Sequence, residues 1–226
     1  MNPTSTQDRR TQEAAERAEP ASARAYRRLE QMIVTLELAP ASVTTEGALI
    51  DRLGLGRTPV REAIQRLAWE GLIDVRPRAG LAIAPLNAGD WLKVIDARRG
   101  VEQVLARAAA RFATHDTAVR FHDAALTMRK AVVAGNVVSF LEADKALDEA
   151  MADAADNPFA GRVAAPLQTQ SRRFWFRYQA DTGLSAAAER HMALIKAILE
   201  GEPDAAAAEA DRLMGLLRAH AEEAVK

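Results

Sequence analysis

The sequence contains no cysteine, and only 5% of its 226 residues are aromatic. The absence of cysteine excludes disulfide bonds and thiolate metal sites. No apolar run is long enough to span a membrane, and the N-terminus lacks the apolar core of a signal peptide, so we expect a cytoplasmic protein with no membrane partner. Because the formal net charge is only −1, an affinity for nucleic acid has to come from a local cluster of charge.

The most informative segment is residues 53–67, which read LGLGRTPVREAIQRL. Thr58 can cap a helix here, and Pro59 suits the first helical position, where its missing N–H has no partner to lose. A buried face follows at helical spacing, formed by Val60, Ile64 and Leu67. Arg57 and Arg61 project from the N-terminal end of this helix, the end with which a helix-turn-helix protein contacts the major groove of DNA.

Two helices are expected before this segment and a hairpin after it. The first helix stops at Pro40, and its apolar face comprises Tyr26, Leu29, Ile33 and Leu36. Thr45 can cap the second helix. Two short apolar runs, 72–75 and 81–84, flank a turn that contains proline and glycine, a pattern that predicts a β-hairpin. Residues 21–87 therefore predict a winged helix-turn-helix domain, which follows a polar, disordered tail over residues 1–20.

Basic side chains cluster within this domain. The cluster comprises Arg57, Arg61, Arg66, Arg76 and Arg78. Such clusters form the electrostatic footprint of a protein on phosphate, and arginines at the tip of a wing can reach the backbone or the minor groove. We therefore expect double-stranded DNA as a partner.

Residues 88–226 show helical patterns only, so the fold class is mainly α. Glycine and proline breaks, caps and periodicity divide this part into about six helices, near 88–113, 116–134, 136–155, 158–180, 184–201 and 203–225. We expect an all-α bundle.

Arg98 interrupts the apolar stripe of the first of these helices. A buried, unpaired guanidinium is costly, so Arg98 needs a partner. Glu102 lies one turn later and can form an internal ion pair with it. Alternatively, Arg98 holds the carboxylate of a ligand. Periodicity alone leaves both interpretations open.

Polar residues interrupt the apolar stripes of other helices as well. Asp144 and Asp148 share one face of their helix, and His191 lies on the inward face of another. Gln170 and Arg177 align with Val163, Leu167 and Phe174 in a third. Since buried polar groups need partners, these residues predict a shared polar cavity. Carboxylates with an imidazole suggest a divalent metal, and arginine suggests an anion.

Residues 53–64 resemble the LGVSRTPVREAL signature of GntR-type transcriptional regulators of the FadR/FCD branch. Shorter resemblances are EGLI at 70–73, PRAG at 77–80, DARRGVE at 96–102, NP at 157–158 and ERH at 189–191. Six rather than seven helices in the effector domain resembles the VanR-like subgroup. Gly47 and Gly56 depart from the family, which often has a basic residue and a serine at these positions, so the operator sequence cannot be transferred.

The resemblance implies a homodimer on a palindromic operator, with residues 88–226 as the effector-binding and dimerisation domain. The candidates for DNA contact are Thr45, Arg57, Thr58, Pro59, Arg61, Arg66, Arg78 and Gly80. The family uses an aspartate and three histidines around a metal such as zinc. Asp144 and His191 match two of these positions, whereas Asp148 and Leu213 replace the other two. Asp144, Asp148 and His191 are thus the candidate metal ligands, and a metal-free pocket is the alternative.

The resemblance also assigns Arg98 to the carboxylate of a small effector. The candidates for effector binding are Arg98, Glu102, Asp144, Gln170, Arg177 and His191. The predicted function is a ligand-responsive DNA-binding regulator, a repressor and not an enzyme. The alternatives are a metal-dependent enzyme in the helical half and a constitutive DNA-binding protein without an effector.

Overall fold

The computed structural model describes residues 19–179 and 183–226. The chain divides into two compact units between Pro85 and Leu86, and each unit is described by itself. The predicted tail, residues 1–20, lies outside the described residues except for Glu19 and Pro20. In the described part of the chain, no helix is both long and apolar enough to cross a lipid bilayer.

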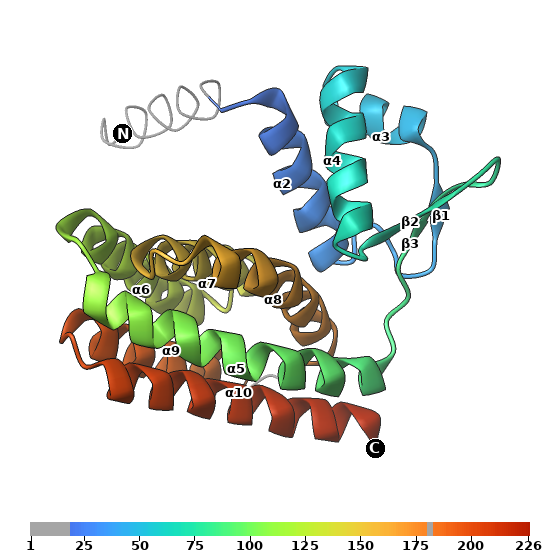
Figure 1. Cartoon of the computed structure of the whole chain (residues 1–226). Helices are drawn as coiled ribbons and strands as arrows, with labels where there is room; N and C mark the ends of the chain where they lie inside the picture. The colour runs from blue at the N-terminus through green and yellow to red at the C-terminus, as the bar shows by residue number, and fades with distance from the viewer. Residues whose placement is uncertain (1–18, 180–182) are drawn as a thin grey trace, which may run out of the picture. The chain divides into compact units, whose positions relative to one another are not determined.

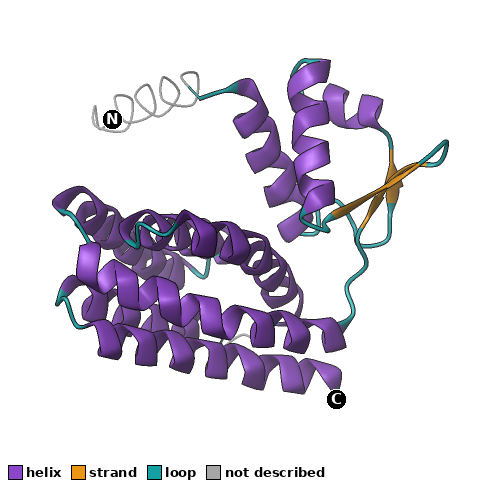
Figure 2. Cartoon of the chain, viewed as in Figure 1, coloured by secondary structure: helices purple, strands orange, loops and turns teal. Residues whose placement is uncertain are grey.

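In its described residues, 19–85, the first unit combines three helices with a small antiparallel sheet (Figures 1 and 2). The helices are α2 (Ala21–Val34), α3 (Glu46–Leu53) and α4 (Arg57–Trp69). The strands are β1 (Val43–Thr44), β2 (Ile73–Arg76) and β3 (Gly80–Ile83), in the order β1-β3-β2. The β2–β3 hairpin is the predicted wing, and the prediction of a winged helix-turn-helix fold is confirmed.

The core of this unit lies between α2, α4 and the sheet. Its largest fully buried side chains include Leu29, Ile33, Leu49, Leu67, Leu72 and Ile83. The apolar face predicted for α4 is buried, since Val60, Ile64 and Leu67 all belong to this core. Burial of such side chains stabilises the unit and fixes the direction of the exposed first turn of α4.

Three details of the predicted first unit are wrong. Helix α2 ends at Val34, because Leu36 has a left-handed φ of 59° and so leaves the helical face. Thr58 does not cap α4: the helix begins at Arg57 after an extended Gly56, and no described side chain caps it. The sheet also has a third strand, β1. The sequence did not predict this strand, because two residues are too short for a periodic signal.

The second unit is the predicted helical bundle. Its helices are α5 (Ala88–Phe112), α6 (His115–Ala134), α7 (Val137–Ala154), α8 (Pro158–Tyr178), α9 (Gly183–Leu199) and α10 (Pro203–Val225). Helix α5 packs against α7, α8, α9 and α10, whereas α6 packs mainly on α7 and α9 (Figure 1). Polar side chains that point inward from α5, α7, α8 and α9 therefore meet in the centre of the bundle.

Candidate functional site

The first turn of α4 carries exposed polar side chains. Arg57 and Thr58 are exposed, Pro59 is half-buried, and no described side chain caps the N–H groups of this turn. Arg61 is exposed one turn later and donates to both carboxylate oxygens of Glu46 on α3, at 3.2 and 3.0 Å. Uncapped N–H groups and cations at a helix N-terminus favour an anionic partner.

Arg66 does not belong to this exposed first turn, because its side chain contacts α2 and the end of α4 instead. Its guanidinium lies 3.7 Å from the ring centroid of Tyr26 on α2 and donates to Glu70 at 3.0 Å. Tyr26 in turn donates its hydroxyl hydrogen to Glu70 at 2.7 Å. This arrangement joins α2 to the C-terminal end of α4, and it leaves Arg66 apart from Arg57 and Thr58.

The wing places Arg78 at its tip, where it is exposed and has a left-handed φ of 64°. Gly80 has a φ of 93°, and a Cβ at this position would lie 2.6 Å from the carbonyl oxygen of Thr44. The next residue, Thr45, caps α3 by accepting from the N–H of Ala48 at 3.1 Å. Gly80 and Thr45 thus shape the domain, whereas Arg78 offers an exposed cation.

Arg98 and Glu102 form an ion pair in the centre of the second unit. Arg98 donates through Nε and Nη2 to one oxygen of Glu102, at 2.9 and 2.7 Å. Gln168 on α8 donates to the same oxygen at 3.0 Å. All three side chains are buried. The internal pair, which was one of two open interpretations, is the arrangement that the structure has.

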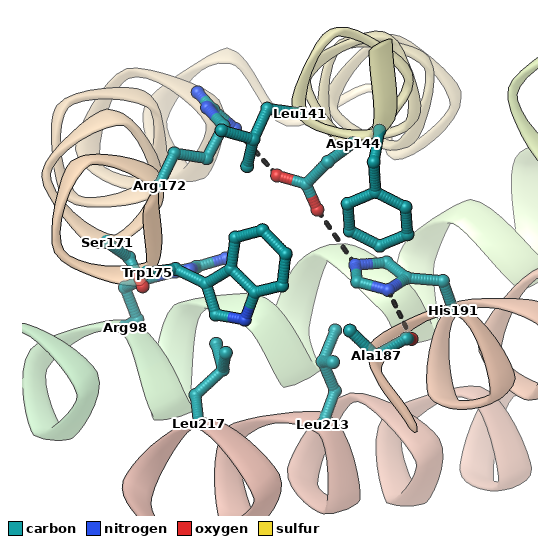
Figure 3. Close-up of a pocket in the computed structure, with 11 residues that line it drawn as sticks. Arg98, Leu141, Asp144, Ser171, Arg172, Trp175, Ala187, His191, Leu213 and Leu217 are labelled. Carbon is teal, nitrogen blue, oxygen red and sulfur yellow. Dashed lines mark hydrogen bonds and ion pairs between the residues drawn. The ribbon is translucent and has the colours of Figure 1, made fainter. Parts of the chain in front are cut away.

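A second ion cluster adjoins the first. Arg172 on α8 donates through Nη1 to Asp148 at 2.6 Å and to Asp144 at 3.3 Å, both on α7 (Figure 3 shows the Asp144 contact). Its Nη2 donates to Thr169 at 3.1 Å. Arg172 is buried, so its charge is balanced by the two carboxylates rather than by water.

His191 on α9 completes this cluster. Its Nε2 lies 2.8 Å from Asp144, and its Nδ1 lies 2.6 Å from the carbonyl oxygen of Ala187 (Figure 3). Both of these partners accept hydrogen bonds, so both ring nitrogens have to donate. Burial by itself lowers the pKa of His191, but the hydrogen bond and the charge of Asp144 outweigh burial and raise it. The geometry therefore favours an imidazolium.

The pKa values of the two aspartates shift in opposite directions. Burial by itself raises the pKa of Asp144, but the hydrogen bond from His191 and the charges of His191 and Arg172 hold it well below its usual range. Burial, together with the neighbouring carboxylates of Asp144 and Glu102, raises the pKa of Asp148 to about 7. Asp144 therefore stays ionised, whereas Asp148 exchanges its proton near neutral pH.

A small cavity of about 30 Å³ lies against this cluster. Arg98, Asp144, Arg172 and His191 line its polar side. Its apolar side comprises Phe140, Leu141, Trp175, Leu213 and Leu217. Such a volume holds about two water molecules. The indole of Trp175 lies in the middle of the site with its nitrogen toward Leu213 and Leu217 (Figure 3), and this nitrogen is buried with no hydrogen-bond partner among the described residues.

The candidate metal ligands do not fit a metal ion. Among the described residues, no group of three or more His, Asp or Glu side chains is arranged to hold one. The guanidinium of Arg172 already contacts Asp144 and Asp148, and His191 directs Nε2 at Asp144. Leu213, at the position of a family histidine, contributes only an apolar wall.

Three predicted effector residues do not line the cavity: Glu102, which is paired with Arg98, and Gln170 and Arg177 on α8. Arg177 is exposed and lies 5.3 Å from the ring centroid of Tyr178, and Gln170 is half-buried outside the lining. The inward face predicted for α8 was wrong. It was aligned on Val163, which is 58% exposed and so does not lie on the buried side of the helix. The inward positions are Gln168, Arg172 and Trp175, which the sequence did not single out. Every residue from Ser171 to Trp175 is buried, so spacing alone does not distinguish Arg172 from its neighbours.

Curated relatives of this chain are transcriptional regulators. A segment of 73 residues is 42% identical to an uncharacterized HTH-type regulator of Streptomyces ambofaciens, covering 32% of this chain and 30% of that protein. Over 143 residues the chain is 28% identical to the repressor RspR of Escherichia coli K12, covering 61% of this chain and 60% of RspR. A probable D-xylose utilization operon repressor of Paenarthrobacter nicotinovorans is 27% identical over 155 residues, covering 69% of this chain and 68% of that repressor.

Solved structures share the fold. The structure of E. coli McbR/YncC covers 92% of this chain and all of its own, with a TM-score of 0.79 and 15% identity. The structure of a putative GntR regulator from Rhodococcus sp. RHA1 covers 90% of this chain and 95% of its own, with a TM-score of 0.63 and 20% identity. Residues 21–83 match the family of bacterial regulatory proteins named gntR, and residues 93–216 match the FCD domain. The chain therefore belongs to the gntR family of bacterial regulators that carry an FCD domain.

Proposed function

We propose that this chain is a DNA-binding transcriptional repressor whose activity responds to a small effector. The observation that carries the DNA-binding half is the exposed, uncapped first turn of α4 with Arg57 and Thr58 beside it. Arg61 would exchange Glu46 for a phosphate or a base edge, and Arg78 would contact DNA from the wing. This target would place the protein in the cytoplasm.

The test is DNA binding as a function of salt. Operator fragments selected from a genomic library are bound by the parent and by Arg57→Ala. If Arg57 contacts a phosphate, the variant binds more weakly and the slope of log affinity against log salt falls by about 1. Arg162→Ala, a change of the same kind on α8, is the matched control. Equal affinity and slope for parent and Arg57→Ala would contradict the proposed surface.

The effector site is the cavity beside the two ion clusters. Its volume of about 30 Å³ is too small for a metabolite, so an effector has to open it. Two arginines and an indole N–H are donors that a carboxylate could use, and Arg98 would exchange Glu102 for it. Since Arg172 already supplies a cation between the aspartates, the proposed site works without a resident metal, and we assign it no catalytic step.

Trp175→Phe tests this site. The variant keeps an aromatic ring in the cavity but loses the only N–H of the indole. A panel of small carboxylic acids is screened by thermal shift with the parent, and each acid that stabilises it is titrated into both proteins. We expect at least a fivefold loss of affinity with a melting temperature near that of the parent. Unchanged affinity for every such acid would overturn the assignment.

Effector binding would favour one arrangement of the two DNA-binding units of a homodimer and so change its affinity for a palindromic operator. Support for two copies comes from the family and from operator symmetry, which mirrors the two-fold symmetry of a dimer. An assay of the selected fragment with and without the stabilising acid tests the coupling. Release of DNA on addition of the acid is the expected result for a repressor.

A further inference from the structure

The wall that α10 contributes to the cavity is apolar. Leu213 and Leu217 line the cavity from this helix, and both are buried. Figure 3 shows the two leucines pointing from α10 toward the indole of Trp175. Phe140 and Leu141 extend the apolar surface from α7. Apart from the indole N–H, a ligand that lies against this wall meets carbon atoms, which offer it no hydrogen bond.

The cations on the polar side of the cavity already have anionic partners. Arg172 donates to Asp144 and Asp148, and the imidazole of His191 is directed at Asp144. Asp144 itself lines the cavity. A ligand carboxylate that approached Arg172 or His191 would lie beside the carboxylate of Asp144 and be repelled by it. The polar side therefore disfavours a second negative charge on the ligand.

Two donors can hold one carboxylate. Arg98 is released when it exchanges Glu102, which then keeps the hydrogen bond that Gln168 donates to it. The N–H of Trp175 is buried and has no hydrogen-bond partner among the described residues. Arg98 and Trp175 line the same cavity of about 30 Å³, so they lie close enough for the two oxygens of a single carboxylate.

Further polar groups on the ligand would weaken its binding. A hydroxyl against the leucines leaves water without gaining a hydrogen bond, and a second carboxylate there would be a buried charge without a partner. A hydrocarbon chain or ring gains instead from leaving water. Displacing the leucine side chains breaks no hydrogen bond or ion pair, so the apolar wall is also the side on which a ligand can make room.

We propose that the effector is a monocarboxylate with an apolar body. Its carboxylate is held by Arg98 and Trp175, and its hydrocarbon chain or ring packs against Leu141, Leu213 and Leu217. Dicarboxylates and polyhydroxy acids are rejected. This proposal rests on the effector site proposed above and names the class of ligand that the site takes.

Two matched sets of acids test this ligand class. Hexanoate, adipate and gluconate share the length of their carbon chain, but adipate adds a second carboxylate and gluconate adds hydroxyls. Benzoate, terephthalate and gallate are the aromatic counterparts. Isothermal titration calorimetry of the full chain measures their dissociation constants. Hexanoate or benzoate should bind at least about tenfold more tightly than its two matched acids, which bury unpaired polar groups. The alcohols 1-hexanol and benzyl alcohol should lose about tenfold as well, because they lack the carboxylate.

Leu213→Asn tests whether the α10 wall sets this selectivity. The asparagine offers a partner to a hydroxyl, so the ratio of the affinities for hexanoate and gluconate, or for benzoate and gallate, should fall by about fivefold or more. Leu213→Met keeps the wall apolar at a similar volume and should retain the ratio. Because each ratio is measured within one protein, a general loss of affinity in either variant does not change it.

The outcomes separate the ligand class from the site. Tighter binding of a diacid or a polyhydroxy acid than of its matched monoacid would overturn the proposal and leave the carboxylate site standing. An unchanged ratio in Leu213→Asn would also overturn the proposed role of the wall. Equal binding of acids and alcohols would contradict the carboxylate site itself, and the proposal with it. A parent that binds neither hexanoate nor benzoate overturns this ligand class, even if the thermal-shift panel yields another acid.

Discussion

At the scale of the residue, a missing β-carbon lets the small sheet form. Gly80 pairs across from Arg76 in the wing, and its φ of 93° brings it against β1. A side chain at this position would both strain the backbone and press on the carbonyl oxygen of Thr44. The local turn that contains Gly80 could be predicted from the sequence, but its contact with a residue 36 positions earlier could not.

Gly80→Ala should destabilise the first unit by about 1–3 kcal/mol, because the strained conformation persists only if the surrounding structure enforces it. Urea unfolding followed by circular dichroism measures this loss. Gly215→Ala is the control. Gly215 lies inside α10, where an added β-carbon would meet open space among the described residues. Alanine there should raise the free energy of unfolding by up to about 1 kcal/mol. Equal stability of Gly80→Ala and the parent would contradict the close approach.

Asp148 makes stability depend on pH. Its pKa of about 7 in the folded chain lies above the usual 3.8. A carboxyl group whose folded pKa is raised contributes stability below its unfolded pKa and loses this contribution as the pH rises to its folded pKa. The contribution of Asp148 therefore falls between about pH 4 and pH 7, because the buried group has to ionise beside Asp144 and Glu102.

Asp148→Asn cannot ionise and should escape this loss. We expect the melting temperature of the variant, relative to that of the parent, to rise between about pH 5 and about pH 8. Each kcal/mol of stability that the parent loses over this range should appear as a difference of about 2–4 °C. Glu149→Gln, the same change at an exposed neighbour, should show no such trend. A difference that is constant with pH would show that Asp148 ionises normally in the folded chain.

At the scale of the element, α5 and α8 show what a helical pattern can predict. Helix α5 has one buried face, so the spacing of Arg98 and Glu102 offered their pairing as one of two interpretations, and the structure has this pair. In α8 every residue from Ser171 to Trp175 is buried. A segment that is buried on all sides has no periodicity to select an inward face, so Arg172 was hidden among its neighbours. The polar centre could be predicted, but its central cation could not.

The start of α4 carries a prediction of its own. Gly56 precedes the helix in an extended conformation without a capping side chain, and a β-carbon there would meet only ordinary contacts with Pro59. Gly56→Ser should therefore stabilise the first unit by about 0.5 kcal/mol, through a cap and a less flexible unfolded chain. Thermal unfolding is the measurement. Gly54→Ser should destabilise instead, because Gly54 has a φ of 63°. A loss of stability in both variants would argue against the extended cap.

At the scale of the whole molecule, the chain contains two units with separate interiors. The core of the first unit comprises residues between Ala25 and Ile83 only. The ion clusters and the cavity belong to α5, α7, α8, α9 and α10, all in the second unit. Composition and periodicity could predict both units, since each consists of elements with strong local signals. They could not predict how tightly the centre of the bundle closes, which depends on side chains from several helices at once.

Residues 86–226 should accordingly fold and function alone as the effector part of the molecule. We expect this fragment to unfold cooperatively and to bind the same carboxylic acids as the full chain, because every contact proposed for these properties lies within the second unit. It should lose DNA binding, since Arg57 and Arg78 are absent. Calorimetry and sedimentation of the fragment beside the full chain measure these properties. A fragment that is unfolded, or that fails to bind an acid bound by the full chain, would show that the first unit completes the effector domain.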